Sequence, residues 1–174
     1  MLQKNNRYKV LKVFLDFPTS EFGLRELSRK VGISAPSVKK YLLEFGEKGI
    51  VEVIEVRGNP IYIANRDSEN FKFYMRLSTQ YELFASGLID FIWKNVSPEA
   101  IVFYGGYFKG DATEESDIDL FAIGKKCDLD LSKYERIFGK EIHLMVNELN
   151  KIPKELKNNL INGIVMRGYL KILI

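Results

Sequence analysis

Two aspartates separated by one residue, Asp117 and Asp119, follow a polar loop that begins at the paired glycines Gly105 and Gly106. In a strand, residues i and i+2 point the same way, with Cα atoms about 6–7 Å apart. Two carboxylates so placed repel each other unless a cation lies between them, and they suit two divalent ions about 3.5–4 Å apart. Mg²⁺ prefers oxygen ligands and keeps some positions for phosphates and water, so few protein ligands suffice. The pair therefore predicts a divalent metal site.

The glycines predict the other half of the same chemistry. Gly105 and Gly106 have no side chains, so their backbone N–H groups are free to approach a triphosphate, as in other anion-binding nests. Together with the aspartates they are typical of a site that directs attack on the α-phosphate of a nucleotide.

The segment IVFYGGYFKGDATEESDIDLFAIG carries a family resemblance. It resembles the minimal nucleotidyltransferases of the DNA polymerase beta superfamily, whose pattern is an apolar residue, Gly-Gly or Gly-Ser, a loop and Asp-x-Asp. The resemblance extends over about residues 98–170, and the ending ELKNNLINGIVMRGYL is similar to the closing helix of those proteins. It implies that Asp117 and Asp119 hold Mg²⁺ or Mn²⁺. It also implies that Gly105, Gly106 and Lys109 bind the phosphates of an NTP, with Lys109 where members commonly have Arg.

The sequence departs from the family pattern at His143, the single histidine of the chain. Active members have a third carboxylate at the matching position, which helps bind the metal and takes the proton of the attacking hydroxyl. Three alternatives follow. His143 is itself a ligand or base, since neutral imidazole binds metals and its pKa suits a base; or Glu141 replaces the missing carboxylate; or the site binds nucleotide or metal without turnover. Losing one of three anionic ligands favours the last.

The C-terminal half alternates strands and helices around these residues. We expect strands at Ala100–Tyr104, Ile118–Ile123 and Glu141–Val146, a short helix at Leu131–Phe138 and a last helix near Pro153–Met166. This pattern predicts an α/β unit of about 75 residues.

The N-terminal half predicts three helices and a hairpin. Apolar spacing indicates helices from about Asn5 to Asp16, from Leu24 to Val31, and from the N-cap Ser34 to about Lys48. Alternating strands then flank a turn at Arg57-Gly58-Asn59-Pro60. Over about residues 5–65 this order resembles a winged helix-turn-helix. The resemblance implies double-stranded DNA as a partner, with the third helix in the major groove. We expect contacts from Ser34, Ser37, Lys39, Lys40, Tyr41 and Arg57.

A long helical segment from about Ser68 to Val96 connects the two halves. Its apolar stripe, which includes Phe71, Met75 and Ile92, is too wide for an exposed spacer. Because winged-helix regulators usually dimerise on two half-sites, we expect this helix to be the element of a homodimer.

The composition agrees with a folded protein that meets nucleic acid. Residues 1–66 hold 12 Lys and Arg against 7 Asp and Glu, a net charge of +5, whereas residues 67–174 carry −2. The basic excess lies in the half expected to contact DNA. Cys127 is the one cysteine, and neither an apolar run long enough to cross a bilayer nor a secretory signal is present, so we expect a cytoplasmic protein.

These observations predict an α+β protein with three parts: a winged-helix DNA-binding domain at 1–66, a linking helix at 67–97, and a small mixed-sheet nucleotidyltransferase fold at 98–174. The functional hypothesis is a transcriptional regulator whose C-terminal domain binds a nucleotide and a metal but is catalytically impaired. The alternative is an active enzyme that moves an NMP from an NTP to a protein or RNA hydroxyl. In related minimal members the modified target is a HEPN-type toxin, so the alternative includes an antitoxin role with such a toxin as partner.

Overall fold

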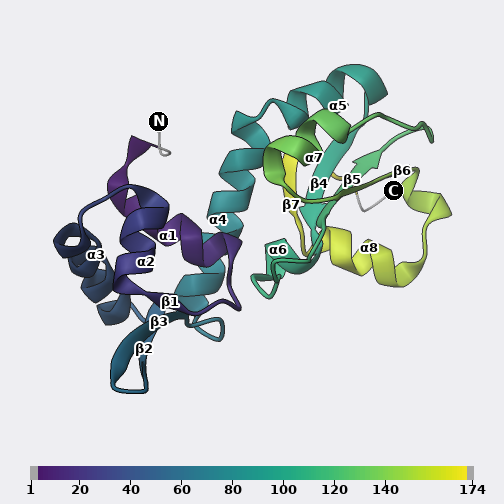
Figure 1. Cartoon of the computed structure of the whole chain (residues 1–174). Coiled ribbons are helices and arrows are strands. Elements are labelled where there is room, and N and C mark those ends of the chain that lie inside the picture. The colour runs from purple at the N-terminus through teal and green to yellow at the C-terminus, as the bar shows by residue number, and fades with distance from the viewer. Residues whose placement is uncertain (1–3, 172–174) are drawn as a thin grey trace. The chain divides into compact units, whose positions relative to one another are not determined.

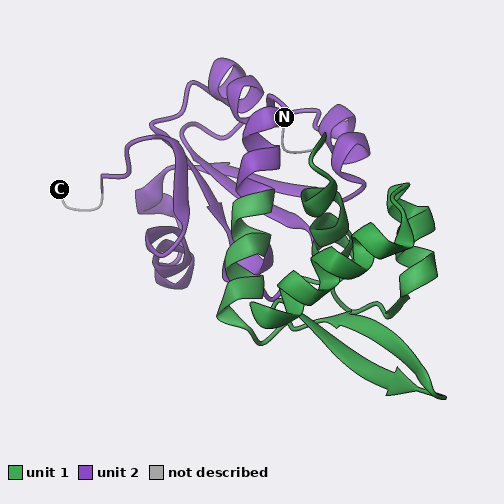
Figure 2. Cartoon of the chain, turned by 90° about the vertical axis from the view of Figure 1, so that its left-hand side faces the viewer, with its two compact units in different colours: residues 1–78, 112–114 green, residues 79–111, 115–174 purple. Residues whose placement is uncertain are grey.

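The computed structural model describes residues 4–171. Residues 1–3 of the expected first domain and residues 172–174 of the expected last domain lie outside the described residues. The chain divides into two compact units (Figures 1 and 2). Unit 1 consists of residues 1–78 and 112–114, and unit 2 of residues 79–111 and 115–174. Within the described part of the chain, no helix has the length and apolar character needed to span a membrane.

Unit 1 contains the expected three helices, α1 (Asn6–Asp16), α2 (Leu24–Val31) and α3 (Ala35–Glu47). Their apolar faces meet in a core of fully or nearly fully buried side chains, Val10, Phe14, Leu27, Val38, Leu42 and Phe45. The hairpin of β2 (Val51–Val56) and β3 (Asn59–Ala64) is also present. A short strand that the sequence did not predict, β1 (Phe22–Gly23), pairs antiparallel with β3 and makes a three-stranded sheet of order β1-β3-β2.

The hairpin turn is set by two residues with left-handed backbone conformation. Val56 pairs with Asn59, which leaves Arg57 and Gly58 as the loop, with φ of 52° and 75°. Positive φ at both positions is the geometry that matches the twist of the flanking strands. The turn therefore carries Arg57 at the tip of the hairpin.

The segment between the two halves forms two helices, so the prediction of one continuous helix was wrong. α4 (Glu69–Ala85) runs from unit 1 into unit 2, and α5 (Leu88–Val96) follows after a break. The break falls at Gly87, whose φ of 81° is left-handed and incompatible with a continuing helix. Ser86 reinforces it because its hydroxyl accepts from the Leu88 backbone N–H.

Unit 2 is built on a four-stranded mixed sheet. Its strands are β4 (Ala100–Tyr104), β5 (Ile118–Ile123), β6 (Ile142–Asn147) and β7 (Ile164–Gly168), in the spatial order β6-β5-β4-β7. β4 is antiparallel to both neighbours, whereas β5 and β6 are parallel. The connections hold α6 (Gly105–Lys109), α7 (Ser132–Phe138), the 3₁₀ turn η2 (Leu149–Lys151) and α8 (Lys154–Ile161).

The predicted closing helix to Met166 was wrong, because α8 ends at Ile161 and the chain returns as β7. Two glycines make that return possible. A Cβ at Gly163 would lie 2.7 Å from the Phe103 carbonyl oxygen, and one at Gly168 would lie 2.2 Å from the Glu99 carbonyl oxygen. β7 therefore packs against β4 at a distance that only glycine allows at these two positions.

Helices cover both sides of this sheet (Figure 1). On one side, Ile152 and Leu160, from the α8 region, pack against Val102 of β4 and Phe121 of β5. α5 and α7 meet through Phe91 and Tyr134, whose ring centroids lie 5.3 Å apart. Because every residue of β4 is buried, this central strand is enclosed on both faces and fixes the position of the turn that follows it.

Candidate functional site

The candidate site lies where three neighbouring strands of unit 2 place polar side chains in one row. The register pairs Tyr104 of β4 with Asp119 of β5, and Asp119 with His143 of β6. Directly paired residues of adjacent strands point to the same face of a sheet. Tyr104, Asp119 and His143 therefore form a row across the sheet at the end of β4, with the carboxylate in the middle.

Asp119 is held tightly against the glycine turn. Gly105 follows β4 with a φ of 79°, and a Cβ built there would lie 1.9 Å from the Asp119 Oδ2 atom and 2.7 Å from its Cγ atom. The left-handed conformation and the missing side chain are thus both required at this position. The sequence predicted Gly105 as a phosphate-binding residue; the structure shows in addition that it makes the space in which the Asp119 carboxylate lies.

Asp117 stands just before β5 and is exposed, whereas the Asp119 side chain is 26% exposed. The backbone N–H of Ile118 donates to the Glu141 carbonyl oxygen at 3.0 Å. Glu141, which precedes β6 and is exposed, is therefore held at the same end of the sheet as the two aspartates.

His143 contacts Asp119 directly. Its Nδ1 atom lies 3.3 Å from the Asp119 Oδ1 atom, and its side chain is 58% exposed. The position at which the sequence resemblance implies a third carboxylate is thus filled by an imidazole that faces the Asp119 carboxylate. A neutral imidazole with the proton on Nδ1 donates to this carboxylate and leaves Nε2 as an acceptor.

Gly106 and Lys109 lie on α6, the single helical turn that starts directly after β4. Gly105 and Gly106 form its first two residues, so their backbone N–H groups have no carbonyl partner earlier in the helix. Lys109 is the last residue of α6 and is exposed.

Tyr104 is a member of the site that the sequence did not predict. Burial raises the pKa of its hydroxyl, and the negative charge of Asp119 raises it further. Tyr104 is therefore a neutral phenol beside the carboxylate at physiological pH. The signal that identifies it is its place as the last residue of the apolar strand, and this signal has meaning only when the β4–β5 register is known.

The donor set fits a cation that completes its coordination with substrate. Asp117 and Asp119 offer carboxylate oxygens at one end of the sheet, and both are accessible. Within residues 4–171, however, no three His, Cys, Asp or Glu side chains group closely enough to hold a metal by themselves. A cation here thus depends on phosphate and water oxygens for its remaining ligands, which is how Mg²⁺ usually binds in nucleotide sites.

A family model matches the segment of the chain that holds this site. Residues 87–167 match the family described as Polymerase beta, Nucleotidyltransferase. Residues 87–167 form a nucleotidyltransferase-type domain. The match begins at Gly87 and so includes α5 and the whole Gly105–Asp119 segment. Members of this family generally use an NTP and a divalent metal. A search of curated proteins and a search of solved structures found no match to the chain.

The second group of predicted site residues lies in unit 1. Ser34 stands at the N-cap position of α3, but its hydroxyl makes no capping hydrogen bond to the helix backbone; it donates instead to the Ser37 hydroxyl at 2.9 Å. Lys39 and Lys40 are exposed on α3, and Tyr41 is half-buried. These five residues therefore share the first two turns of one helix, while Arg57 is exposed at the hairpin tip.

We predict that Gly105→Ala destabilises the nucleotidyltransferase domain strongly, because the new methyl group meets the Asp119 carboxylate as well as an unfavourable φ. Gly139→Ala is the matched control, since Gly139 has a φ of 64° in the same unit with nothing within 4 Å of its Cβ position. We expect Gly105→Ala to cost at least about 2 kcal/mol more than Gly139→Ala, measured by urea unfolding.

Asp119→Ala is the partner in a double-mutant cycle. It removes the two atoms nearest to the added methyl group, so the excess cost of Gly105→Ala should fall in the double variant. Equal costs for Gly105→Ala with and without Asp119 would contradict the proposed packing.

Proposed function

We propose that this protein is a cytoplasmic, DNA-binding transcriptional regulator whose nucleotidyltransferase domain binds an NTP with Mg²⁺ or Mn²⁺ and turns it over poorly or not at all. The observation that carries the proposal is the contact between His143 and Asp119 at 3.3 Å. It puts an imidazole ring, which is never an anion at physiological pH, beside the carboxylate that holds the metal, where an active site of this type needs a third anion.

The binding roles follow from charge and accessibility. Asp117 and Asp119 hold the cation, and Lys109 and the N–H groups of Gly105 and Gly106 bind the phosphates. When bound, the cation neutralises charge on the phosphate oxygens. Imidazole is a poorer ligand for Mg²⁺ than a carboxylate, so His143 favours Mn²⁺ over Mg²⁺ where it binds at all.

Retention of both aspartates supports the second candidate, an active nucleotidyltransferase. In that reaction a hydroxyl oxygen of a protein or RNA attacks the α-phosphorus, the bond to the β-phosphate oxygen breaks, and pyrophosphate leaves. His143 accepts the hydroxyl proton through Nε2, the ring nitrogen that does not contact Asp119. The acceptor in the antitoxin version is a HEPN-type toxin.

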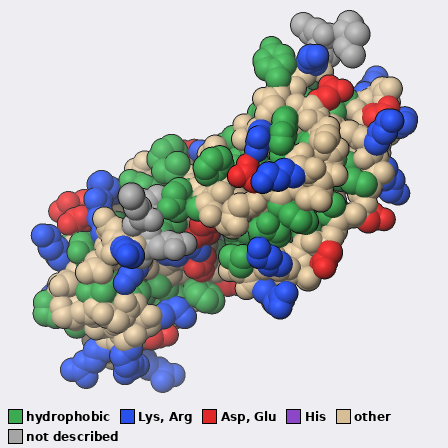
Figure 3. Space-filling model, turned by 90° about the horizontal axis from the view of Figure 1, so that it is seen from above, with side chains coloured by type: hydrophobic (Ala, Val, Ile, Leu, Met, Phe, Trp, Pro, Cys, Tyr) green, Lys and Arg blue, Asp and Glu red, His purple; other side chains and the backbone are tan. Residues whose placement is uncertain are grey.

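The architecture of unit 1 supports DNA binding. Three helices followed by a hairpin with an exposed basic tip are the arrangement of a winged helix-turn-helix. Figure 3, which shows one face, has Lys and Arg side chains gathered at its lower left, on the side of unit 1. Lys39 and Lys40 would contact phosphates, and Ser34, Ser37 and Tyr41 would face the groove.

Exposed apolar residues on α4 support a homodimer. Phe73, Leu77 and Phe84 are 51%, 48% and 68% exposed. At 3.6 residues per turn they point within about 40° of one another. A second copy of α4 would bury this stripe, which is otherwise in contact with water.

We predict that the protein binds Mn²⁺–ATP but transfers little or no labelled nucleotide. Asp117→Asn/Asp119→Asn should abolish binding, because it removes both negative charges, while Asp128→Asn, at another exposed aspartate of unit 2, should not. Calorimetry measures binding, and incubation with each of four labelled NTPs measures transfer. Transfer that disappears in the double variant would establish the enzyme instead of the sensor.

His143→Asp tests the missing ligand within the same assay. If the third position alone limits turnover, this substitution should raise transfer at least about tenfold, equivalent to 1.4 kcal/mol of transition-state stabilisation. His143→Asn is its control, since it changes the ring without supplying an anion. Equal transfer by both variants would contradict the assigned role.

We predict that duplex DNA from the region upstream of the protein's own gene binds through α3. Lys39→Ala/Lys40→Ala should weaken binding and lower the slope of log affinity against log salt by about 2, because each phosphate contact releases about one counterion. Lys126→Ala/Lys154→Ala has the same net charge change in unit 2 and should leave the slope unaltered. Gel shifts over a salt series measure both, and equal behaviour of the two variants would exclude α3.

We predict that Leu77→Glu converts a dimer to a monomer, because it places a charge in the apolar stripe of α4. Ile137→Glu, at a side chain of α7 that is 57% exposed, is the control and should remain dimeric. Light scattering after size-exclusion chromatography measures the mass. A monomeric parent protein would sink the dimer proposal.

A further inference from the structure

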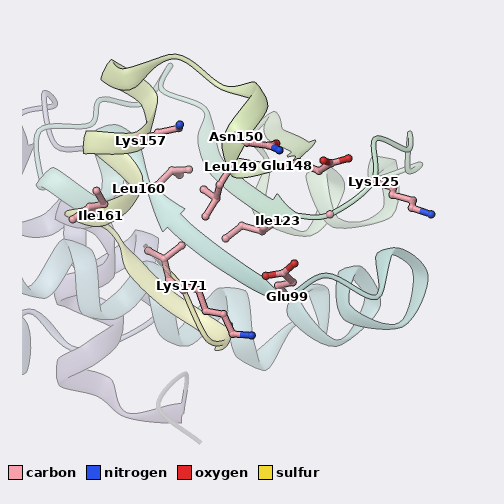
Figure 4. Close-up of a pocket in the computed structure, with 12 residues that line it drawn as sticks. Glu99, Ile123, Lys125, Glu148, Leu149, Asn150, Lys157, Leu160, Ile161 and Lys171 are labelled. Atoms are coloured by element: carbon pink, nitrogen blue, oxygen red, sulfur yellow. The ribbon is translucent and has the colours of Figure 1, made fainter. Parts of the chain in front are cut away.

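Unit 2 contains a cavity of about 660 Å³ that none of the functions above uses (Figure 4). It is lined by the end of β5, by the residues just before β4 and just after β6, by η2 and α8, and by the segment after β7. A volume of this size is typical of sites for small organic ligands. The residues that line it are Glu99, Ile123, Gly124, Lys125, Glu148, Leu149, Asn150, Lys157, Leu160, Ile161, Leu170 and Lys171.

The inner wall of the cavity is apolar. Figure 4 shows Ile123, Leu149 and Leu160 in its middle. Ile123 and Leu160 belong to the core of the sheet and are 4% and 1% exposed, and Leu149 and Leu170 pack against that core. A ligand that enters therefore meets the accessible side chains of Leu149, Ile161 and Leu170, which lie in front of this buried core.

The rim of the cavity is positively charged. Lys125, Lys157 and Lys171 line it, and none of them forms an ion pair with another residue of the described chain, 4–171. Two acids also line it, but Glu148 is already paired with Lys151, whose Nζ atom lies 2.7 Å from its Oε1 atom. Among the acids that line the cavity, Glu99 is thus the one without an ion pair, against three such lysines, so the rim favours an anion.

The cavity is separate from the nucleotide site. Ile123 lies four residues after Asp119 on β5, about 13 Å away along an extended strand. Phe121 lies between them on the same face and is completely buried. A ligand in the cavity therefore has no path along this face to the Asp119 carboxylate.

We propose that this cavity binds an amphipathic carboxylate, an acyl chain with one anionic head, whose chain packs on Leu149 and Leu170, in front of the buried Ile123 and Leu160, while its head is held by the rim lysines. The acyl chain of such a ligand matches the apolar wall, and its anionic head matches the lysines of the rim. A neutral hydrocarbon would match only the wall, and a fully polar anion would match only the rim.

The test is titration of the full chain with octanoate, followed by amide NMR, with octan-1-ol as the neutral probe of equal length. Octanoate should shift the Gly124 and Asn150 amide signals in a saturable way and bind at least about tenfold more tightly than the alcohol. Lys157→Gln and Lys171→Gln should each weaken octanoate binding severalfold, while Lys154→Gln, on α8 but outside the cavity, should not.

Ile161→Glu is a second test of the same cavity that does not depend on the lysine variants. Ile161 lines the cavity but is 47% exposed, so the change leaves the core intact and puts a negative charge at the rim. It should reduce octanoate binding at least tenfold. Equal affinity for octan-1-ol, shifts confined to residues outside the cavity, or displacement of octanoate by Mg²⁺–ATP would each overturn the proposal.

Discussion

The Asp119 carboxylate lies in the space that a side chain at residue 105 would fill, and the rest of the candidate site depends on this contact. Because Gly105 has a φ of 79°, the chain turns from β4 into α6 without an intervening loop residue. The β4–β5 register then places Asp119 opposite Tyr104 at that turn. One packing contact therefore positions both groups of the proposed site: the backbone N–H groups that would bind phosphate and the carboxylate that would bind metal.

The same row of side chains explains how the site is stable without a third acid. Two adjacent carboxylates repel, so an active site of this type depends on its cations to hold them together. Here Asp119 has a phenol on one side and an imidazole on the other, and both are hydrogen-bonding groups without negative charge when neutral. A carboxylate in place of His143 would therefore raise the repulsion in the folded protein and, for the same reason, would raise the attraction for a metal.

Elements with a clear local pattern were predictable from the sequence, and elements decided by tertiary contact were not. β4 and β5 occupy their predicted ranges because both are apolar runs bounded by polar or glycine-rich segments. Residues 164–166 were predicted as the end of the last helix, yet close approach to β4 makes them part of β7. The Asp117–Asp119 pair was visible as a motif, whereas Tyr104 became part of the site only through strand register.

Three residues of β5 on the same face of the sheet have different surroundings. Asp119, near the start of the strand, is partly exposed beside the glycine turn, whereas Phe121 in the middle is buried against Val102 and Leu160. Ile123, at the end of the strand, lines the cavity. Because the buried phenyl ring closes the middle, the polar end and the apolar end do not form a continuous groove. A nucleotide at one end and an amphipathic anion at the other would therefore occupy different surfaces of unit 2, separated by the buried Phe121 ring and without direct contact between the two ligands.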